Sequence, residues 1–230
     1  MTAAMGPGAT GAAAHVFVAD LDAPVLAAED RHHLERVLRL RRGAQVTVSD
    51  GVGRWRLARL GPALEPQGPV EHEPEPRPEI TIAFAVLKGD RPELVAQKLT
   101  EVGVDRIVPI VSERCVVRWD VQRSARHVDR LRRITREAAM QCRRARLPVV
   151  DEVAHFAEVA RWPGATLAEA GGEPPALERP VVLIGPEGGW SPEEAGIGVT
   201  HTALGPHILR SETAAIVAGA LLVAQRTALG

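Results

Sequence analysis

The first third of the chain contains two runs in which apolar and polar residues alternate on either side of a turn. Residues 45–49 and 54–60 carry this alternation, and Asp50-Gly51-Val52-Gly53 separates them. A period of two around an Asp-Gly pair is typical of a β-hairpin. A further short strand is expected at residues 15–18, so this part of the chain predicts a small β-rich domain.

A helix is expected between the first strand and the hairpin, at residues 29–40. Leu34, Val37 and Leu38 recur there at helical spacing, and we expect them on its buried face. After the hairpin, residues 61–78 hold six prolines and four glutamates. Proline is disfavoured inside sheets, so this stretch predicts a domain boundary with at most an edge strand.

From residue 80 onward, short apolar runs alternate with helical stretches. Residues 80–87 form a nearly continuous apolar run, which is typical of a strand buried on both faces of a parallel sheet. Asp90 begins a helix that Gly103 ends, and residues 120–146 contain a long helix rich in arginine. The other expected elements are a helix near residues 156–159 and strands at residues 106–111, 149–150, 166–168 and 181–184. This alternation predicts an α/β domain with a mostly parallel sheet.

Two loops rich in glycine and proline lie near the end of the chain, and each precedes a helix. The first comprises residues 185–189 and the second residues 204–210. Ser191 and Glu194 offer a helix cap after the first loop, and a helix from Ser211 runs to the C-terminus. Backbone amides exposed by glycine beside helix N-termini predict a pocket for a polar small molecule.

The composition indicates a folded, globular protein of one large or two small domains. The chain has 230 residues, a formal net charge of -1 and 45% hydrophobic residues. Residues 1–14 lack basic residues and a long apolar segment, so we expect a disordered extension rather than a signal peptide. We expect no apolar run to reach membrane-spanning length, because polar residues and glycine interrupt the terminal helix, and Cys115 and Cys142 form no zinc motif. We therefore expect a cytoplasmic protein with no membrane segment and no metal.

Arginine is concentrated in two segments, although the net charge is close to zero. Residues 114–146 hold eleven arginines against three acidic residues, and residues 31–59 hold eight against two. Guanidinium groups suit the geometry of phosphate, so a polynucleotide is the expected partner. The alternative is that these arginines lie on solvated helix faces.

The sequence lacks the motifs of several common enzyme classes. It contains no Gly-x-Ser-x-Gly elbow, no Walker phosphate-binding loop and no His-Glu-x-x-His zinc site. The first glycine loop does not fit the Gly-x-Gly-x-x-Gly pattern of dinucleotide-binding proteins. His32 and His33 are adjacent, which favours an ordinary surface pair over shared metal ligands, and Cys142 has no evident base beside it in the sequence.

An ordered set of short motifs covers most of the chain from about His15 onward. They are His33-x-x-Arg36-Val37-Leu38-Arg39, Asp50-Gly51, Gln97-Lys98-x-x-Glu101-x-Gly103-Val104, Pro109-x-x-x-Glu113-Arg114, Glu137-Ala138-x-x-Gln141, Arg146-x-Pro148, Leu183-Ile184-Gly185-Pro186-Glu187-Gly188-Gly189 and Leu204-Gly205-x-x-Ile208-Leu209-Arg210-x-Glu212-Thr213-Ala214. Each motif is weak alone, but the ordered set is specific. With it, the chain resembles the RsmE-type 16S rRNA methyltransferases of the SPOUT superfamily.

The resemblance implies two domains joined by a linker. Residues 15–70 would form a PUA-like β-barrel that docks RNA, residues 71–79 a proline-rich linker, and residues 80–230 a SPOUT α/β domain tied in a C-terminal trefoil knot. It also implies a homodimer with its cofactor and RNA sites near the subunit interface. The implied activity is methylation of N3 of a specific uridine in 16S rRNA of the small ribosomal subunit, with S-adenosylmethionine as the methyl donor.

The resemblance places S-adenosylmethionine among the two glycine loops. Glycines there let backbone groups approach the ligand, and the apolar residues are candidates to enclose the adenine. Packing in the core is an equal alternative for each apolar residue. The candidate cofactor-binding residues are Leu183, Ile184, Gly185, Pro186, Glu187, Gly188, Gly189, Leu204, Gly205, Ile208, Leu209, Thr213 and Ala214.

Methyl transfer to uridine N3 needs an imide that loses its proton, held in line with the methyl group. Arg210 is the first candidate to stabilise negative charge on the uracil carbonyls, and an ion pair with Glu212 is its alternative role. Glu101, Glu137 and Glu187 are candidates for a general base. Electrostatic stabilisation without a dedicated base is equally open.

Arginines from both halves are candidates for phosphate contacts with RNA. They are Arg36, Arg39, Arg41, Arg54, Arg114, Arg143, Arg144 and Arg146. Members of the family often carry an arginine in the first strand, where this chain has His15. That role is lost, transferred to His15 or filled from elsewhere.

Two other functions stay open at this point. One is a different SPOUT methyltransferase that acts on tRNA or on another rRNA base. The other is a non-catalytic RNA-binding factor in ribosome assembly, which would keep the pocket without turnover. A binding factor needs neither the pair of glycine loops nor Arg210 near Glu212, so their presence favours an enzyme.

Overall fold

The chain folds into two compact units in the computed structural model, which describes residues 6–117 and 121–229. The first unit ends at Glu75 and also contains the later segment Arg136–Leu147, and the remaining residues from Pro76 onward form the second.

This division differs from the predicted domains in one respect. The units divide within the predicted linker at residues 71–79, but the predicted second domain runs without interruption from residue 80. The long helix α3 (Val121–Cys142) instead contributes its last residues to the first unit. Met140 packs against the core of that unit and Arg136 forms an ion pair with Asp30, which explains the assignment.

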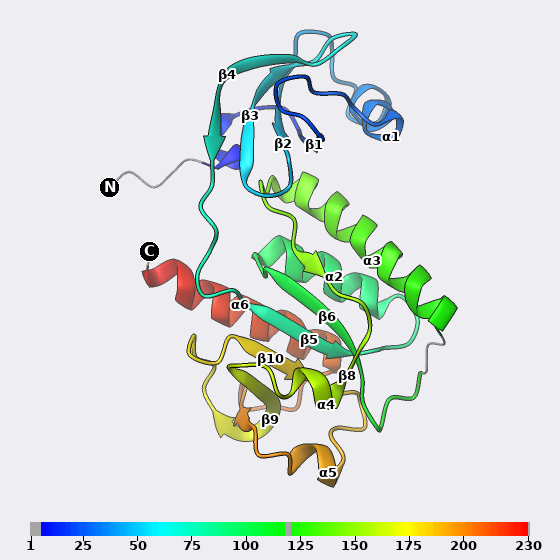
Figure 1. Ribbon diagram of the computed structural model, residues 1–230, viewed down its shortest axis with the longest axis vertical. Helices are drawn as coiled ribbons and strands as arrows, with labels where there is room; N and C mark the ends of the chain where they lie inside the picture. The colour runs from blue at the N-terminus through cyan, green and yellow to red at the C-terminus, as the bar shows by residue number, and fades with distance from the viewer. Residues whose placement is uncertain (1–5, 118–120, 230) are drawn as a thin grey trace. The chain divides into compact units, whose positions relative to one another are not determined.

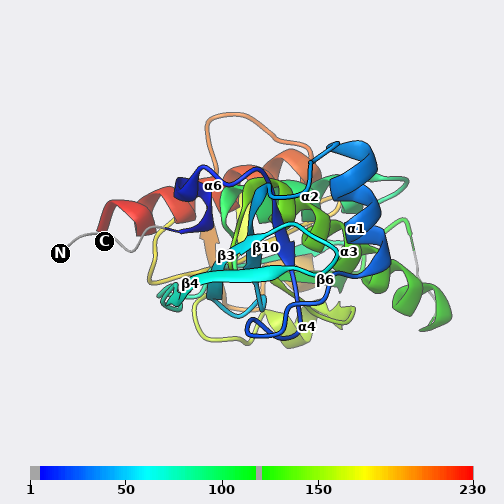
Figure 2. The ribbon, with the colours of Figure 1, turned by 90° about the horizontal axis from the view of Figure 1, so that it is seen from above.

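The first unit is built on a four-stranded sheet in the order β1-β2-β3-β4. β1 pairs with β2 in parallel, and the β2–β3 and β3–β4 pairs are antiparallel (Figures 1 and 2). The predicted hairpin is β2–β3, and Asp50 accepts hydrogen bonds from the amides of Val52 (2.9 Å) and Arg54 (3.1 Å) in its turn. The strands are β1 (His15–Phe17), β2 (Gln45–Ser49), β3 (Arg54–Arg59) and the edge strand β4 (Glu65–His72).

Residues 6–14 pack onto the first unit, whereas the sequence predicts a disordered extension through residue 14. A 3-10 helix (η1) spans Pro7–Thr10, and Ala12 and Ala14 are buried. The amide of Ala13 donates to the carbonyl of Gln45 at 2.8 Å. The prediction is wrong for these residues because alanine is small enough to be buried close to a strand. Residues 1–5 of the predicted extension lie outside the described residues.

The predicted helix at residues 29–40 is shorter and changes type along its length. An α-helix, α1 (Ala28–His32), continues as a π-helix, η2 (His33–Val37). The amide of Leu38 donates to the carbonyl of His33, five residues earlier, so side chains are rotated away from regular helical spacing. Leu34 is buried as predicted, but Val37 (60%) and Leu38 (44%) are exposed, so that part of the prediction is wrong.

The second unit contains a parallel sheet in the order β11-β9-β10-β5-β6-β7, with β8 also paired to β6. Every pair in it is parallel, which confirms the predicted α/β class. All five residues of β5 are buried, as expected for a strand covered on both faces. The strands are β5 (Thr81–Ala85), β6 (Arg106–Val111), β7 (Val149–Val150), β8 (Ala154–His155), β9 (Ala165–Glu173), β10 (Val181–Ile184) and β11 (Thr200–Thr202).

Several helices cover this sheet. They are α2 (Arg91–Val102), the first part of α3, α4 (Phe156–Val159), α5 (Pro192–Ala195) and α6 (Ser211–Leu229) (Figure 1). Gly103, with φ 103°, ends α2 as predicted. A Cβ atom on Gly219 of α6 would lie 2.7 Å from Val104 and 2.9 Å from Leu99, so glycine permits the close approach of α6 to α2.

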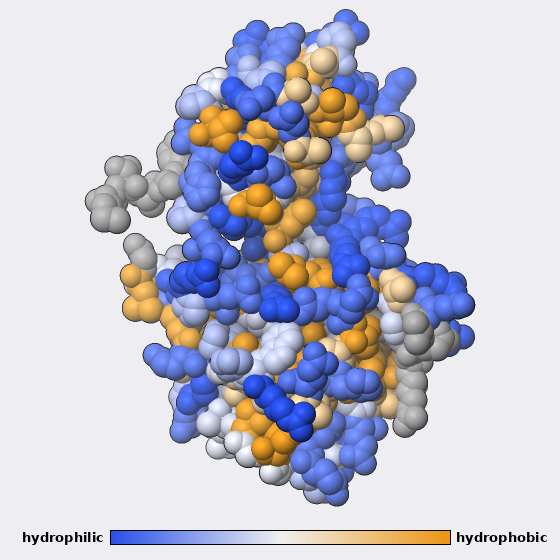
Figure 3. Space-filling model, in the orientation of Figure 1, coloured by the Kyte–Doolittle hydropathy of each residue, from blue (hydrophilic) through white to orange (hydrophobic). Residues whose placement is uncertain are grey.

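Within the described residues, α6 is the one helix long and apolar enough to cross a membrane by length and composition alone. The expectation that no run reaches this length is therefore wrong by that criterion. α6 buries Ala215, Ala218 and Leu222 in the core of the second unit, and 28% of its apolar stretch is buried. On the face drawn in Figure 3, hydrophobic residues form small groups among hydrophilic ones.

Candidate functional site

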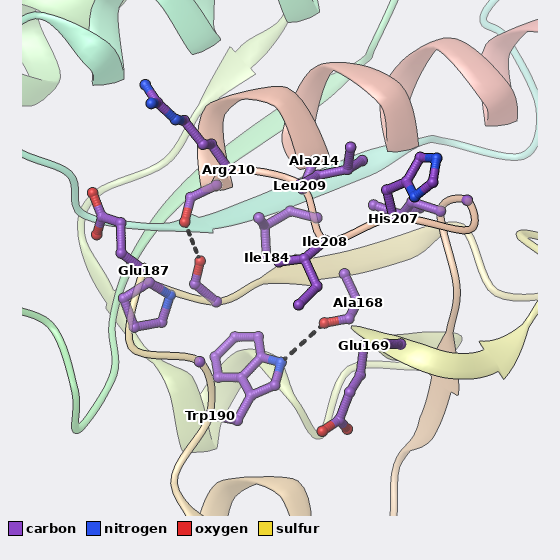
Figure 4. Close-up of a pocket in the computed structure, with 17 residues that line it drawn as sticks. Ala168, Glu169, Ile184, Glu187, Trp190, His207, Ile208, Leu209, Arg210 and Ala214 are labelled. Atoms are coloured by element: carbon purple, nitrogen blue, oxygen red, sulfur yellow. Dashed lines mark hydrogen bonds between the residues drawn. The ribbon is translucent and has the colours of Figure 1, made fainter.

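A cavity of about 420 Å³ lies in the second unit, where β10 ends and β9 continues beyond its pairing with β10. Parallel sheets commonly bind ligands at the carboxyl ends of their strands. Two loops enclose the cavity, and the first turn of α6 completes it (Figure 4). The lining residues are Ala168, Glu169, Ala170, Ile184, Gly185, Pro186, Glu187, Gly189, Trp190, Leu204, Gly205, His207, Ile208, Leu209, Arg210, Ser211 and Ala214. A mostly apolar lining with a few polar groups is typical of a small-molecule site.

Most of the predicted cofactor-binding residues line this cavity, but Leu183, Gly188 and Thr213 do not. Leu183 is fully buried in the core. The carbonyl of Gly188 accepts a hydrogen bond from Arg114 at 3.0 Å, and Thr213 is exposed on α6. Contact of the lining residues with a cofactor stays a prediction.

The first loop, residues 185–189, leads into a fully formed capping box. The hydroxyl of Ser191 accepts from the amide of Glu194 at 3.2 Å, and the Glu194 carboxylate accepts from the amide of Ser191 at 3.1 Å. The other oxygen of that buried carboxylate accepts from the amide of Glu113 at 2.9 Å. The cap predicted from the sequence is thus confirmed, and it also ties the loop to the segment after β6.

Two arginines hold the same loop from outside. Arg91, in the first turn of α2, forms an ion pair with Glu187. Arg114 donates to the Gly188 carbonyl, so this predicted RNA contact is engaged with the loop. The Arg91 and Glu187 side chains are both about two-fifths exposed, and such pairs contribute less than about 1 kcal/mol.

The second loop, residues 204–210, has few attachments. No hydrogen bond joins residues 205–209 to another residue in the described part of the chain. Ile208 is 95% exposed although it lines the cavity. The loop is fixed at its end by Ser211, whose hydroxyl donates to the carbonyl of Gly185 at 2.7 Å (Figure 4).

Trp190 is a lining residue that the sequence reasoning missed. Its indole Nε1 donates to the carbonyl of Ala168 at 3.3 Å, and its ring lies 5.0 Å from the Phe156 ring. A Cβ atom on Gly185 would lie 3.2 Å from the indole, which explains why glycine follows β10. A large aromatic residue directly after a glycine loop was the signal available in the sequence.

Ala168, Glu169, Ala170 and His207 line the cavity and were also missed. Glu169 pairs with His201 of β11: its Oε2 lies 2.9 Å from His201 Nδ1, and His201 Nε2 lies 3.3 Å from the carbonyl of Ala195. No motif marks these residues, because β9 extends five residues past the predicted strand end at Ala168.

Among the catalytic candidates, Arg210 lines the cavity and its side chain is exposed. In Figure 4 it points away from Trp190, on the side of the cavity where Glu187 lies. Within the described side chains, no ion pair joins Arg210 to Glu212, and Glu212 Oε2 is buried without a hydrogen-bond partner. The alternative role of Arg210, an ion pair with Glu212, is therefore not seen in the structure.

Glu101 and Glu137 do not line the cavity. Glu101 accepts hydrogen bonds from Lys98 (2.7 Å) and Gln97 (3.0 Å) along α2. Glu137 lies exposed on the part of α3 that belongs to the first unit. The role of Glu101 or Glu137 as a general base stays a prediction. Their positions outside the cavity lining do not favour it.

The predicted RNA-binding arginines fall into two groups. Arg36, Arg39 and Arg41 are exposed in the first unit and have no ion-pair partner within its described residues. The others are more constrained: Arg54 pairs with Asp50 at 2.8 Å, Arg143 and Arg144 are half-buried, and Arg146 donates to the carbonyl of Glu73 at 2.8 Å and packs against Gly53. The first group is therefore the better candidate for phosphate contacts.

The basic segments are less charged than the sequence suggests, because acidic residues from elsewhere pair with them. Arg130 of α3 pairs with Glu93 at 2.9 Å, and Arg136 pairs with the buried carboxylate of Asp30 through contacts of 2.6 and 3.0 Å. The hydrogen bonds that Arg136 donates to Asp30 raise the pKa of Arg136. The count of arginines in a segment therefore overstates the positive charge that is free to bind RNA.

His15 is buried in the first unit with only 2% of its surface exposed. Its Nδ1 lies 2.8 Å from the hydroxyl of Thr47, and desolvation by burial lowers its pKa to about 4. The ring is therefore neutral near pH 7 and is not at the surface. The alternative in which His15 takes over an RNA contact from a first-strand arginine is contradicted by this burial.

The described residues contain no group of three His, Cys, Asp or Glu side chains that could hold a metal ion.

Comparison with known proteins identifies both units. The RNA methyltransferase domain family matches residues 73–223, and the RNA methyltransferase PUA domain family matches residues 26–63. The chain is 33% identical over 220 residues to the ribosomal RNA small subunit methyltransferase E of Mycobacterium bovis, covering 84% of this chain and 83% of that protein. Its counterpart in Bacillus subtilis is 29% identical over 219 residues, covering 83% and 85%.

Solved structures agree with these matches. A methyltransferase of Legionella pneumophila in complex with S-adenosylmethionine superposes with a TM-score of 0.80 at 29% identity, covering 92% of this chain and 97% of that one. Ribosomal RNA small subunit methyltransferase E of Neisseria gonorrhoeae, bound to S-adenosylmethionine, gives 0.71 at 27% identity, covering 90% and 95%. The chain therefore belongs to the RNA methyltransferase family of ribosomal RNA small subunit methyltransferase E, and it contains a PUA-like unit and an α/β methyltransferase unit.

Proposed function

We propose that this chain transfers the methyl group of S-adenosylmethionine to N3 of a specific uridine in 16S rRNA of the small ribosomal subunit. The observation that supports this most is the cavity between the two glycine loops. Relatives that share the fold at 29% and 27% identity were solved with this cofactor bound. The curated relatives are named for the RNA of the small subunit.

The residues of the cavity fit S-adenosylmethionine. A volume of about 420 Å³ is within the usual range for a ligand of this size. Ile184, Leu209 and Trp190 offer apolar surface for an adenine ring, and a Cβ atom on Gly189 or Gly205 would meet no other atom within 4 Å, so a ligand can approach the backbone there. When bound, the cofactor supplies a methyl group on a positively charged sulfur, so that a nitrogen nucleophile can bond to the methyl carbon while the sulfur leaves as a neutral thioether.

The chain's own contribution is to hold and polarise the uracil. The exposed guanidinium of Arg210, at the edge of the cavity, would stabilise negative charge on the uracil carbonyls as N3 loses its proton. Glu187 lines the same side of the cavity, whereas Glu101 and Glu137 lie outside the lining, so Glu187 is the nearer candidate to receive that proton. Arg36, Arg39 and Arg41 of the first unit would bind RNA phosphates.

We also propose that the glycine loops belong to a trefoil knot and that the enzyme acts as a cytoplasmic homodimer. Membership of the family supports the knot. An exposed apolar side of α6, which includes Leu221 (38%) and Ala224, supports the dimer, since a second copy would remove it from water. Light scattering during gel filtration tests this: a monomer at micromolar concentration would overturn the dimer.

Methyl transfer to ribosomal substrates tests the proposed reaction. Radiolabelled S-adenosylmethionine is incubated with the protein and unmodified 30S particles, naked 16S rRNA or tRNA, and the product is mapped by mass spectrometry. We expect one methyl group on N3 of a single 16S uridine. Modification of tRNA or of another base would indicate a different specificity, and tight cofactor binding without any methylation would indicate an assembly factor.

A further inference from the structure

Glu169 lies across the cavity from Arg210. Figure 4 shows Arg210 and Glu187 on one side and Glu169 on the other, next to Trp190. Two carboxylates line the cavity within the described chain, and Glu187 is paired with Arg91. Among the residues that the structure describes, no arginine pairs with Glu169, so its carboxylate is the more available hydrogen-bond acceptor.

His201 fixes the direction of this carboxylate. Its Nδ1 lies 2.9 Å from Glu169 Oε2, and its Nε2 lies 3.3 Å from the Ala195 carbonyl. Both partners are acceptors, so the shorter contact to the carboxylate is best made by an Nδ1–H group. The second carboxylate oxygen, Oε1, accepts no hydrogen bond from the described residues and can receive donors from a ligand.

The neighbouring residue on β9 fixes an aromatic ring beside this acceptor. The carbonyl of Ala168 accepts the indole N–H of Trp190 at 3.3 Å, and the indole also packs against Phe156. Consecutive residues of one strand therefore hold a largely buried aromatic side chain, 8% exposed, and a carboxylate at the same end of the cavity. A nucleoside presents the complementary pair, a flat base and a ribose with two hydroxyl donors.

We propose that Glu169 is a cofactor-binding residue that accepts hydrogen bonds from the ribose hydroxyls of S-adenosylmethionine, with His201 as its positioning residue. This inference rests on the proposed function, which puts the reacting methyl group on the Arg210 side. The sulfur is bonded to C5′ of the ribose, so the adenosine extends from the reacting centre toward Trp190 and Glu169. A carboxylate that recognises ribose hydroxyls is also the solution used in dinucleotide-binding folds.

Two ligands distinguish contacts with the adenosine of the cofactor from contacts with its amino acid. S-adenosylhomocysteine carries adenosine and the amino acid, whereas 5′-methylthioadenosine lacks the amino acid. We expect Glu169→Ala to weaken binding of both by about tenfold in calorimetric titrations, since two hydroxyls lose an ionised acceptor. A 2′-deoxy analogue should bind the native protein about as weakly, and Glu169→Ala should not weaken it much further.

Matched variants make the result specific. Glu173→Ala removes an exposed carboxylate of the same strand that does not line the cavity, and we expect it to change both affinities by less than about twofold. His201→Ala should weaken both ligands by about threefold, and His201→Gln, which keeps an N–H donor, should recover most of that loss.

Three results decide the matter. Weaker binding of S-adenosylhomocysteine alone would place the amino acid at Glu169 and overturn the proposal, as would unchanged binding of both ligands. If the native protein binds neither ligand, the proposed function itself fails, which is a different outcome. Circular dichroism of Glu169→Ala shows whether an exposed substitution has left the fold intact.

Discussion

The two glycine loops around the cavity are held in opposite ways. Residues 185–189 are fixed by the Ser191–Glu194 capping box, by Arg91 and by Arg114. Residues 205–209 make no hydrogen bond within the described chain, and Ile208 is 95% exposed. The first loop is therefore held in place without a ligand, whereas the second loop can change its conformation when a ligand binds. This difference suits a site that must bind a cofactor and then admit a large substrate.

The largest expected effect tests the free loop. Arg210→Ala should reduce the single-turnover rate of methyl transfer by about 100- to 1000-fold, because the uracil oxygens lose a charged donor. Cofactor affinity, set by the fixed loop, should change by less than about threefold. A large loss of affinity with a normal rate at saturation would contradict the assigned role. Arg161→Ala, at an exposed arginine outside the cavity, is the control.

The next effect tests the fixed loop. Glu194→Ala leaves the buried amide of Ser191 and the partly buried amide of Glu113 without an acceptor, which should cost about 2–4 kcal/mol of unfolding free energy. We also expect cofactor affinity to fall by about tenfold, measured by calorimetry. Glu193→Ala, at the exposed neighbour on α5, should change neither quantity appreciably. Equal effects of the two variants would show that the cap does not hold the loop.

A smaller effect is expected at the link between the loops. Ser211→Ala removes the 2.7 Å hydrogen bond to the Gly185 carbonyl, which should cost about 1 kcal/mol. Cofactor affinity should fall by about three- to fivefold, because the start of α6 is no longer tied to the fixed loop. Thr227→Ala, which removes a hydroxyl bonded only within α6, serves as the control. A loss as large as that of Glu194→Ala would mean that the second loop is more constrained than its contacts indicate.

The smallest effect concerns the exposed ion pair of the fixed loop. A double-mutant cycle of Arg91→Ala and Glu187→Ala, read in urea unfolding, should give a coupling below about 1 kcal/mol. Because both side chains are partly exposed, the coupling should shrink further at about 1 M salt. A larger coupling that does not respond to salt would assign this pair, rather than the capping box, as the main brace.

The sequence predicts those features whose causes are local. β6 has the expected bounds, Gly103 ends α2, and Ser191 caps α5, because alternation, a left-handed glycine and a capping box act within a few residues. The loops of the cavity were found in the same way, from glycines beside helix starts. The RNA methyltransferase resemblance was confirmed by the family matches to both units.

Features that depend on distant segments were not predicted. The π-turn at η2 leaves Val37 and Leu38 exposed, and helical periodicity gives no sign of it. Glu169 reaches the cavity because β9 runs on to pair with β11, and that pairing is long-range. Arg146 packs against Gly53 of the hairpin and is not exposed for RNA binding. The sequence does not reveal this, because a charged residue gives no sign of which distant segment it contacts.

The position of Trp190 gives this protein an optical reporter of its own. It is the one tryptophan among the residues that line the cavity, and its indole N–H is engaged with a backbone carbonyl. A purine bound beside it would change its emission, whereas Trp55 lies in the first unit, Trp162 packs against Arg106 outside the cavity lining, and Trp119 lies outside the described residues. Occupancy of the site can therefore be followed in real time without a label, with Trp190→Phe as the silent reference.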